Sequence, residues 1–196
     1  MTKPIKILVL DTNVLTSWVE RTLYVNLATS NVIELHWSEV IESDLVEKSL
    51  PNQGKSPEQI KEIVAALHDA LPDAIVHPSI KDYAATSTII DAADRDDLNV
   101  VAAALAAQAD FIVTKNIKHF SREMEQRFGF RVLHSADMIR LLNENYPDYV
   151  AESIATVERY ATKPISELFS NAQLGEVPNM PNSSNVNPPG KLRRIK

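Results

Sequence analysis

Cysteine is missing from this chain and glycine is scarce, with 4 among 196 residues. The absence of cysteine excludes disulfides and thiolate metal sites. It also fits a reducing compartment, so we expect a cytoplasmic protein. With so few glycines a phosphate-cradling loop is not expected, and no G-x-x-x-x-G-K-[ST], G-x-G-x-x-G or G-x-S-x-G motif occurs.

Long apolar runs and an excess of basic residues are also missing. No run approaches the roughly 18 apolar residues of a membrane span. Asp11 cuts short the first apolar run, which makes it a poor signal peptide, and we expect no membrane partner. The net charge of −6 argues against a basic surface that coats nucleic acid. It does not exclude nucleic-acid chemistry, because metal-binding acids add to the negative count.

The pattern that is present alternates short apolar runs with helical periodicity, which predicts an α/β fold with a central parallel sheet flanked by helices. Ser56, Pro57 and Gln59 form a strong helix start, with Ser at the N-cap, Pro at N1 and Gln at N3. The expected strands are 5–10, 32–37, 74–77, 111–114 and 131–134. The expected helices are 14–30, 38–50, 57–71, 81–91, 97–108, a segment ending at Gly129, 135–146 and 148–161.

The chain divides by composition into three parts. Residues 1–147 read as one α/β domain, and residues 148–169 as a helical extension. From residue 170 Asn, Pro, Ser and Gly dominate, so 170–196 is expected to be a disordered tail. The tail ends in a basic segment, 191–196, which we interpret as a solvated terminus; the alternative is an electrostatic contact with RNA or a partner protein.

Asp11 directly follows the apolar run that ends at Leu10. A carboxylate at the C-terminal tip of a buried parallel strand lies where open α/β sheets place their ligands. On its own this position is weak evidence, because many α/β proteins begin in this way. Its weight comes from later segments that can bring further acids to the same edge.

Asp44 lies inside the helix expected after the second strand. It follows Val40 by four residues and Ile41 by three, so it projects from the same face as this apolar stripe. An inward carboxylate is costly unless it is paired or bound to a metal. The alternative is an ordinary acid, partly buried at the edge of the stripe.

A run of acids, 91–97, precedes an alanine-rich helix. Asp97 stands three and four residues before the buried Val100 and Val101, so it points the same way from the first turn. The alternative is a capping role, which either Asp96 or Asp97 could fill, because Asp at a helix start suits both the cap and the dipole.

Thr114 and Asn116 follow the fourth apolar run and can hydrogen-bond a ligand or a carboxylate. An ordinary strand-end turn is an equally good interpretation of these two residues. Carboxylates that converge from different elements repel one another unless a cation intervenes. All-oxygen ligation favours Mg²⁺ or Mn²⁺. Such a site hydrolyses phosphate esters by activating a bound water.

These segments resemble the PIN-domain ribonucleases, in particular the VapC-like toxins of toxin–antitoxin pairs. The matching pieces are 10–15, 38–45, 94–97 with the helix after it, and 109–116, and the likeness spans about residues 5–135. The resemblance implies a three-layer fold whose central parallel sheet is flanked by helices. It also implies Mg²⁺- or Mn²⁺-dependent cleavage of RNA, a homodimer, and a cognate antitoxin that blocks the site.

Carried over position by position, Asp11, Asp44 and Asp97 match the three metal-binding acids, and Asp94 is placed to assist. Two departures matter. The second acid is usually Glu, and a fourth acid of many members falls at Asn116. A one-metal site, or one in which Asp94 compensates, therefore fits better than a complete four-acid site.

Two other functions stay open at this point. A PIN fold with weakened catalysis could serve as an RNA- or protein-binding module, given the missing fourth acid and the negative net charge. A phosphatase-like α/β hydrolase usually carries D-x-D at the first strand, and Asn13 at the second of these positions argues against it.

Overall fold

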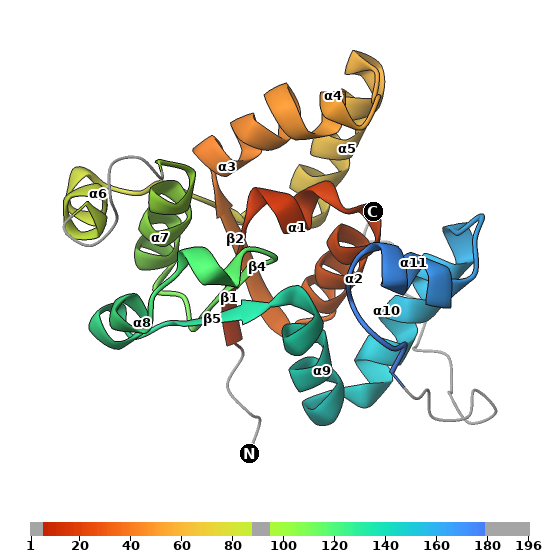
Figure 1. Ribbon diagram of the computed structural model, residues 1–196. Helices are drawn as coiled ribbons and strands as arrows, with labels where there is room; N and C mark the ends of the chain where they lie inside the picture. The colour runs from red at the N-terminus through yellow and green to blue at the C-terminus, as the bar shows by residue number, and fades with distance from the viewer. Residues whose placement is uncertain (1–5, 88–94, 179–196) are drawn as a thin grey trace, which may run out of the picture.

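The computed structural model describes residues 6–87 and 95–178, and its centre is a five-stranded parallel sheet of order β3-β2-β1-β4-β5 (Figure 1). The strands are β1 (Lys6–Leu10), β2 (Ile33–Ser38), β3 (Ile75–Val76), β4 (Phe111–Thr114) and β5 (Arg131–His134). Helices cover both faces, so the predicted fold class is confirmed. Within the described ranges no helix combines the length and apolarity needed to cross a membrane.

The order of the strands places a switch point beside β1. The chain runs outward from β1 through β2 to β3, and then returns to add β4 and β5 on the other side. The carboxyl ends of β1 and β4 are therefore neighbours, and the Asp11 N–H donates to the Val113 carbonyl at 3.1 Å. In open α/β sheets, ligands bind in the crevice at such a point.

The central strands are buried because helices pack on each side of them. Leu8, Val9 and Leu10 of β1 are fully buried, as a parallel strand covered on both faces requires. Helix α7 (Arg95–Ala107) packs against β1, β2 and β4, and its buried alanines allow close approach to the strands. Figure 1 shows α2 (Trp18–Thr29) and α9 (Ser135–Asn145) on the other side of the sheet.

The single helix predicted over 14–30 is wrong: two helices occupy this segment. Helix α1 (Thr12–Thr16) ends at Ser17, whose backbone is extended, and α2 begins directly after it. The Ser17 hydroxyl accepts from the Glu20 N–H, which caps α2. The buried Arg21 guanidinium donates to the carbonyls of Leu15 and Thr16 at 2.5 and 3.3 Å, so it satisfies carbonyls that a helix end leaves open.

A helical hairpin rises above the carboxyl edge of the sheet (Figure 1). Its first arm is α3 (Glu39–Asp44), a π-helical turn η1 (Leu45–Ser49) and α4 (Leu50–Asn52). Its second arm, α5 (Pro57–Ala70), begins with the predicted capping box between Ser56 and Gln59. Val40 is 38% exposed rather than part of the buried stripe, whereas Ile41 and Leu45 are buried.

Several helix boundaries differ from the prediction. Helix α6 (Ile80–Thr86) begins after a capping box from Ser79, and the remainder of the expected helix, to residue 91, extends beyond the described residues. After β4 the chain forms a 3₁₀ turn η2 (Ile117–His119) before α8 (Arg122–Phe128), which ends at Gly129 in the left-handed conformation. The cap of α9 is His134, whose ring accepts from the Ala136 N–H, rather than the predicted Ser135.

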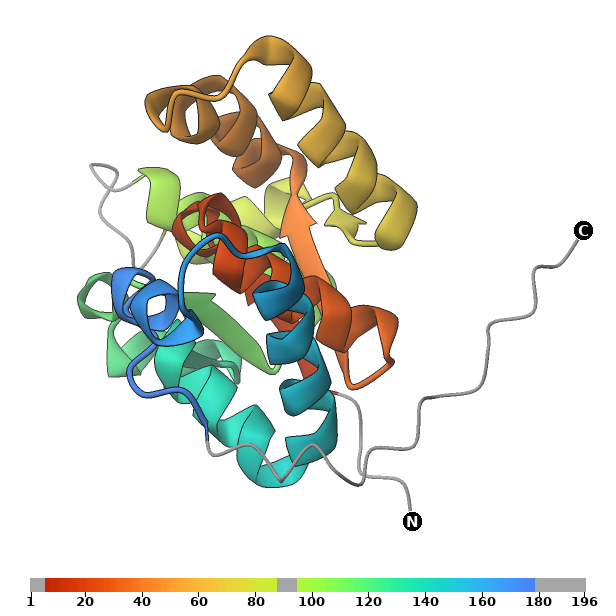
Figure 2. The same ribbon diagram turned by 90° about the vertical axis from the view of Figure 1, so that its right-hand side faces the viewer.

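The C-terminal residues remain packed beyond the point where composition predicted disorder. Helix α10 (Pro147–Tyr160) lies along α2, and α11 (Ile165–Asn171) follows it (Figure 2). Phe169, Ala172 and Leu174 are buried, so apolar side chains anchor the segment after residue 169 as well. Residues 170–178 thus belong to the described part of the chain, and the rest of the predicted tail, 179–196, lies outside the described residues.

Candidate active site

Asp11 lies at the carboxyl edge of the sheet, directly after β1 and beside β4. The Thr114 hydroxyl, fully buried, donates to Asp11 Oδ2 at 2.6 Å. The same hydroxyl accepts from the Asn116 backbone N–H at 3.0 Å. Thr114 therefore orients the Asp11 carboxylate, and the turn after β4 orients Thr114 in turn.

Asn13 is a member of this network that the sequence pattern did not predict. Its amide Nδ2 donates to Asp11 Oδ2 and, at 3.2 Å, to Thr114 Oγ1. Its Oδ1 accepts from the Lys115 N–H at 3.0 Å. The signal in the sequence was its position two residues after Asp11, at the start of α1, which brings its side chain back to the strand tip.

The partial burial of Asp11 disfavours the ionised form of its carboxyl group. Burial raises the pKa of the Asp11 carboxyl above its ordinary value, and hydrogen bonds from Thr114, Asn13 and nearby backbone N–H groups partly oppose this rise. A carboxylate that is desolvated but held by donors on one oxygen suits a neighbouring cation, which would compensate its charge.

Asp44 is the last residue of α3, in the first arm of the hairpin. Its carboxylate pairs with Lys48 at 2.6 Å across the π-helical turn, and its side chain is 21% exposed. The pKa of Lys48 is raised chiefly by this bond to Asp44, with smaller contributions from the charges of Asp96 and Glu47. Helices α3 and α7 also contact each other.

Asp97 belongs to α7. This helix begins at Arg95, two residues earlier than predicted, so Asp97 lies within its first turn rather than at a cap. Its side chain is largely buried, and His119 Nδ1 lies 3.1 Å from Asp97 Oδ2. The proposed assistant, Asp94, lies outside the described residues.

Asn116 contributes through its backbone, and the residue itself is exposed at the start of η2. Among the residues that the structure describes, no group of three or more His, Asp or Glu side chains is placed to hold a metal ion. The side chains of Asp11, Asp44 and Asp97 supply carboxylate oxygens, which are the ligands that a hard divalent cation prefers. Two of the carboxylates, Asp44 and Asp97, pair with a basic side chain.

Glu20 and Lys115 form an ion pair next to this network, and the sequence pattern did not predict it. Glu20 of α2 is fully buried, and Lys115 Nζ lies 2.5 Å from its Oε2 without hydrogen-bond geometry. Burial, and to a smaller extent the charge of Glu20, raises the pKa of the Tyr24 hydroxyl. The signal was available, since Glu20 stands four residues before the buried Tyr24, on the inward face of α2.

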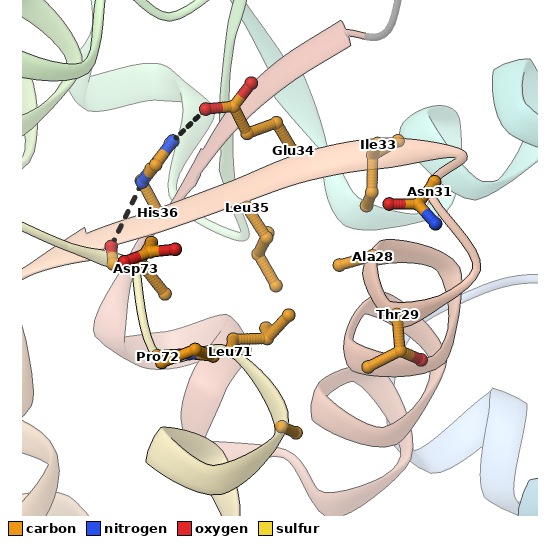
Figure 3. Close-up of a pocket in the computed structure, with 12 residues that line it drawn as sticks. Ala28, Thr29, Asn31, Ile33, Glu34, Leu35, His36, Leu71, Pro72 and Asp73 are labelled. Carbon is orange, nitrogen blue, oxygen red and sulfur yellow. Dashed lines mark hydrogen bonds and ion pairs between the residues drawn. The ribbon is translucent and has the colours of Figure 1, made fainter. Parts of the chain in front are cut away.

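A hollow of about 460 Å³ lies beside the amino half of β2, away from the Asp11 network (Figure 3). In this part of the chain β3 pairs with β2 only at Trp37 and Ser38, and the ends of α2 and α5 close the gap. The His36 ring bonds Glu34 and the Ala74 carbonyl. The hollow lies toward the opposite end of β2 from the acids, so it has no part in their chemistry.

Comparison with known proteins identifies the family of the domain that carries these residues. Residues 7–118 match a family described as the PIN domain, and this range holds Asp11, Asp44, Asp97 and Thr114. No curated protein and no solved structure matches the chain significantly. Helix α8, strand β5 and helices α9 to α11 follow the matched range.

Proposed function

Since the chain belongs to the PIN domain family, whose members are generally nucleases, we propose that it is a metal-dependent endoribonuclease. The observation that carries this proposal is the half-buried Asp11 carboxylate. It lies at the switch point of the sheet, and Thr114 and Asn13 orient it. Burying a carboxylate in a crevice costs stability, and such costs concentrate at functional sites.

In this proposal Asp11, Asp44 and Asp97 hold Mg²⁺ or Mn²⁺, and Asp94 assists. The cation, when bound, lowers the pKa of a water and neutralises charge on the departing oxygen. Thr114 and Asn13 hold the Asp11 carboxylate in one orientation, and Asn116 supports Thr114 through its N–H. Lys48 and His119 would have to release Asp44 and Asp97, and the exposed position of Lys48 makes its release easy.

Three further parts of the proposal rest on the resemblance to VapC-like toxins alone. They are a toxin role in the cytoplasm, a homodimer and a cognate antitoxin. For the domain organisation we propose a nuclease unit over 1–147 and a helical extension from 148. The buried contacts of α10 with α2 hold that extension against the nuclease unit.

The test is cleavage of a total RNA pool by the full chain with Mg²⁺ or Mn²⁺, beside Asp11→Asn and Asp97→Asn. We expect metal-dependent cutting that both variants lose. Asp69→Asn, which changes an exposed acid on α5, is the matched control and should cut normally. Full activity in Asp11→Asn would contradict the proposal.

A second function has one observation in its favour. Asp44 and Asp97 each pair with a basic side chain, and Asn116 replaces a carboxylate, as a PIN fold that only binds RNA or protein would allow. Its signature is an unchanged melting temperature on adding Mn²⁺, together with no cleavage of any RNA. Metal-induced stabilisation that Asp11→Asn abolishes would argue against it.

A further inference from the structure

We propose that a hollow beside Asn13, walled on one side by helix α11, is the subsite for one nucleobase of the RNA strand that is cut. The inference rests on the proposed nuclease function and deepens it. The hollow measures about 350 Å³, within the range of small-ligand sites. Its lining includes Asn13, Trp18, Gln53, Lys115, Leu168 and Asn171.

The hollow adjoins the hydrogen-bond network of Asp11, because Asn13 and Lys115 belong to both. Asn13 donates to Asp11 Oδ2 and also lines the hollow. Lys115 donates its N–H to Asn13 and forms another part of the lining. A strand whose phosphate lies at Asp11 would therefore bring its adjacent nucleotide to this opening.

The lining suits a base better than a phosphate. Of the described residues that line the hollow, Lys115 is the one cation, and its ammonium is already paired with the buried Glu20. An anion would find little uncompensated positive charge there. The indole of Trp18 is 38% exposed and offers a face for stacking. The amides of Gln53 and Asn171, both exposed residues, can donate to and accept from a base edge.

One wall comes from outside the matched domain. Leu168 and Asn171 belong to α11, which Phe169, Ala172 and Leu174 anchor by their burial. The family match ends at residue 118. The C-terminal extension therefore helps to select the nucleotide, while the matched domain supplies the acids.

The first measurement is RNA binding to the full-length Asp97→Asn chain, which separates binding from cutting. The chain has two tryptophans, and Trp37 is fully buried, so a short single-stranded RNA should quench the Trp18 emission. Trp18→Ala should weaken binding about tenfold, and Trp18→Phe should restore most of it because it keeps a ring for stacking. Tyr160→Ala, at an exposed aromatic on α10, is the matched control and should bind normally.

The second measurement is the base preference at the nucleotides that flank the cut, read by sequencing the ends of products from an RNA pool. In the otherwise wild-type chain, Trp18→Ala and Asn171→Ala should raise KM several-fold with little change in kcat and should relax that preference. Asn171→Ala is a small change at an exposed residue, so it keeps the test valid if Trp18→Ala folds poorly.

The outcomes separate the two proposals. Normal cleavage with unchanged KM and preference in both variants overturns the subsite and leaves the nuclease standing. RNA binding with quenching of Trp18 but no cleavage supports the subsite and overturns the nuclease. Neither binding nor cleavage overturns both. An equal loss of binding in Tyr160→Ala would show a general effect of the extension and would also overturn the subsite.

Discussion

The Thr114 hydroxyl donates a 2.6 Å hydrogen bond to Asp11 Oδ2, although 103 residues separate the two in the chain. Neighbouring parallel strands bring them together, since β1 and β4 end side by side. The bond favours the charged form of a carboxyl group whose burial opposes ionisation. The expected behaviour of the Thr114 and Asp11 variants follows from this opposition between burial and hydrogen bonding.

Replacing Thr114 by Val keeps the shape of the buried side chain and removes the hydroxyl. We expect the pKa of Asp11 to rise further and its affinity for Mn²⁺ to fall, because a hydrogen bond to a charged group contributes about 1.5–3 kcal/mol. Half-maximal cleavage should then need roughly tenfold more Mn²⁺. Thr114→Ser keeps the hydroxyl and should behave like the wild type; an unchanged metal dependence in Thr114→Val would refute this role.

Asp11→Asn should make the protein more stable at neutral pH while it abolishes cleavage. Burial raises the pKa of Asp11 in the folded chain, so the folded state binds the proton more tightly than the unfolded state. Ionised Asp11 therefore costs stability at neutral pH, and this cost fades as the pH falls through the raised pKa. We expect a gain of about 1 kcal/mol at pH 7, which is typical of relieving an unfavourable functional site.

The measurement for Asp11→Asn is urea unfolding as a function of pH, with Asp69→Asn as the exposed control. The gain should shrink on acidification. A variant that is less stable than the wild type at pH 7, or a gain that grows toward low pH, would show that the buried charge is better compensated than its surroundings indicate.

Lys115→Met should be strongly destabilising because it leaves the fully buried Glu20 carboxylate without its cation. Breaking a buried pair on one side costs about 3–5 kcal/mol, and the lower end applies because Lys115 is 20% exposed. The double variant Glu20→Leu with Lys115→Met should recover most of the loss, which a double-mutant cycle in urea would measure. Lys48→Met breaks the exposed pair with Asp44 and should change stability little; equal losses in the two lysine variants would contradict the prediction.

Phe169→Ala tests whether the C-terminal extension is part of the cooperative unit. The side chain is fully buried at α11, so its removal should cost about 3 kcal/mol if α11 and the sheet unfold together. Tyr160→Ala, at an exposed position, is the control. A normal melting temperature combined with faster proteolysis after residue 160 would show instead that α11 opens on its own.

The local elements of the fold could be predicted because their causes are local. Continuous apolar runs mark the parallel strands, and Ser56 with Gln59 forms the capping box expected from four consecutive residues. The placement of Asp11 at a strand tip follows from where its apolar run ends. The break at Ser17 escaped prediction because the buried Arg21, which holds the carbonyls of α1, lies on the helix that follows.

The sequence by itself determined the class of fold, the strand tips and the position of the acids along the chain, since these depend on periodicity and on the ends of apolar runs. Only the tertiary structure decided which groups meet. Asn13 bridges to Thr114, Lys115 reaches Glu20, and His119 contacts Asp97 because the sheet order brings distant segments to one edge. The same holds for the segment directly after α11, whose composition indicates a tail although Ala172 and Leu174 are buried on the domain.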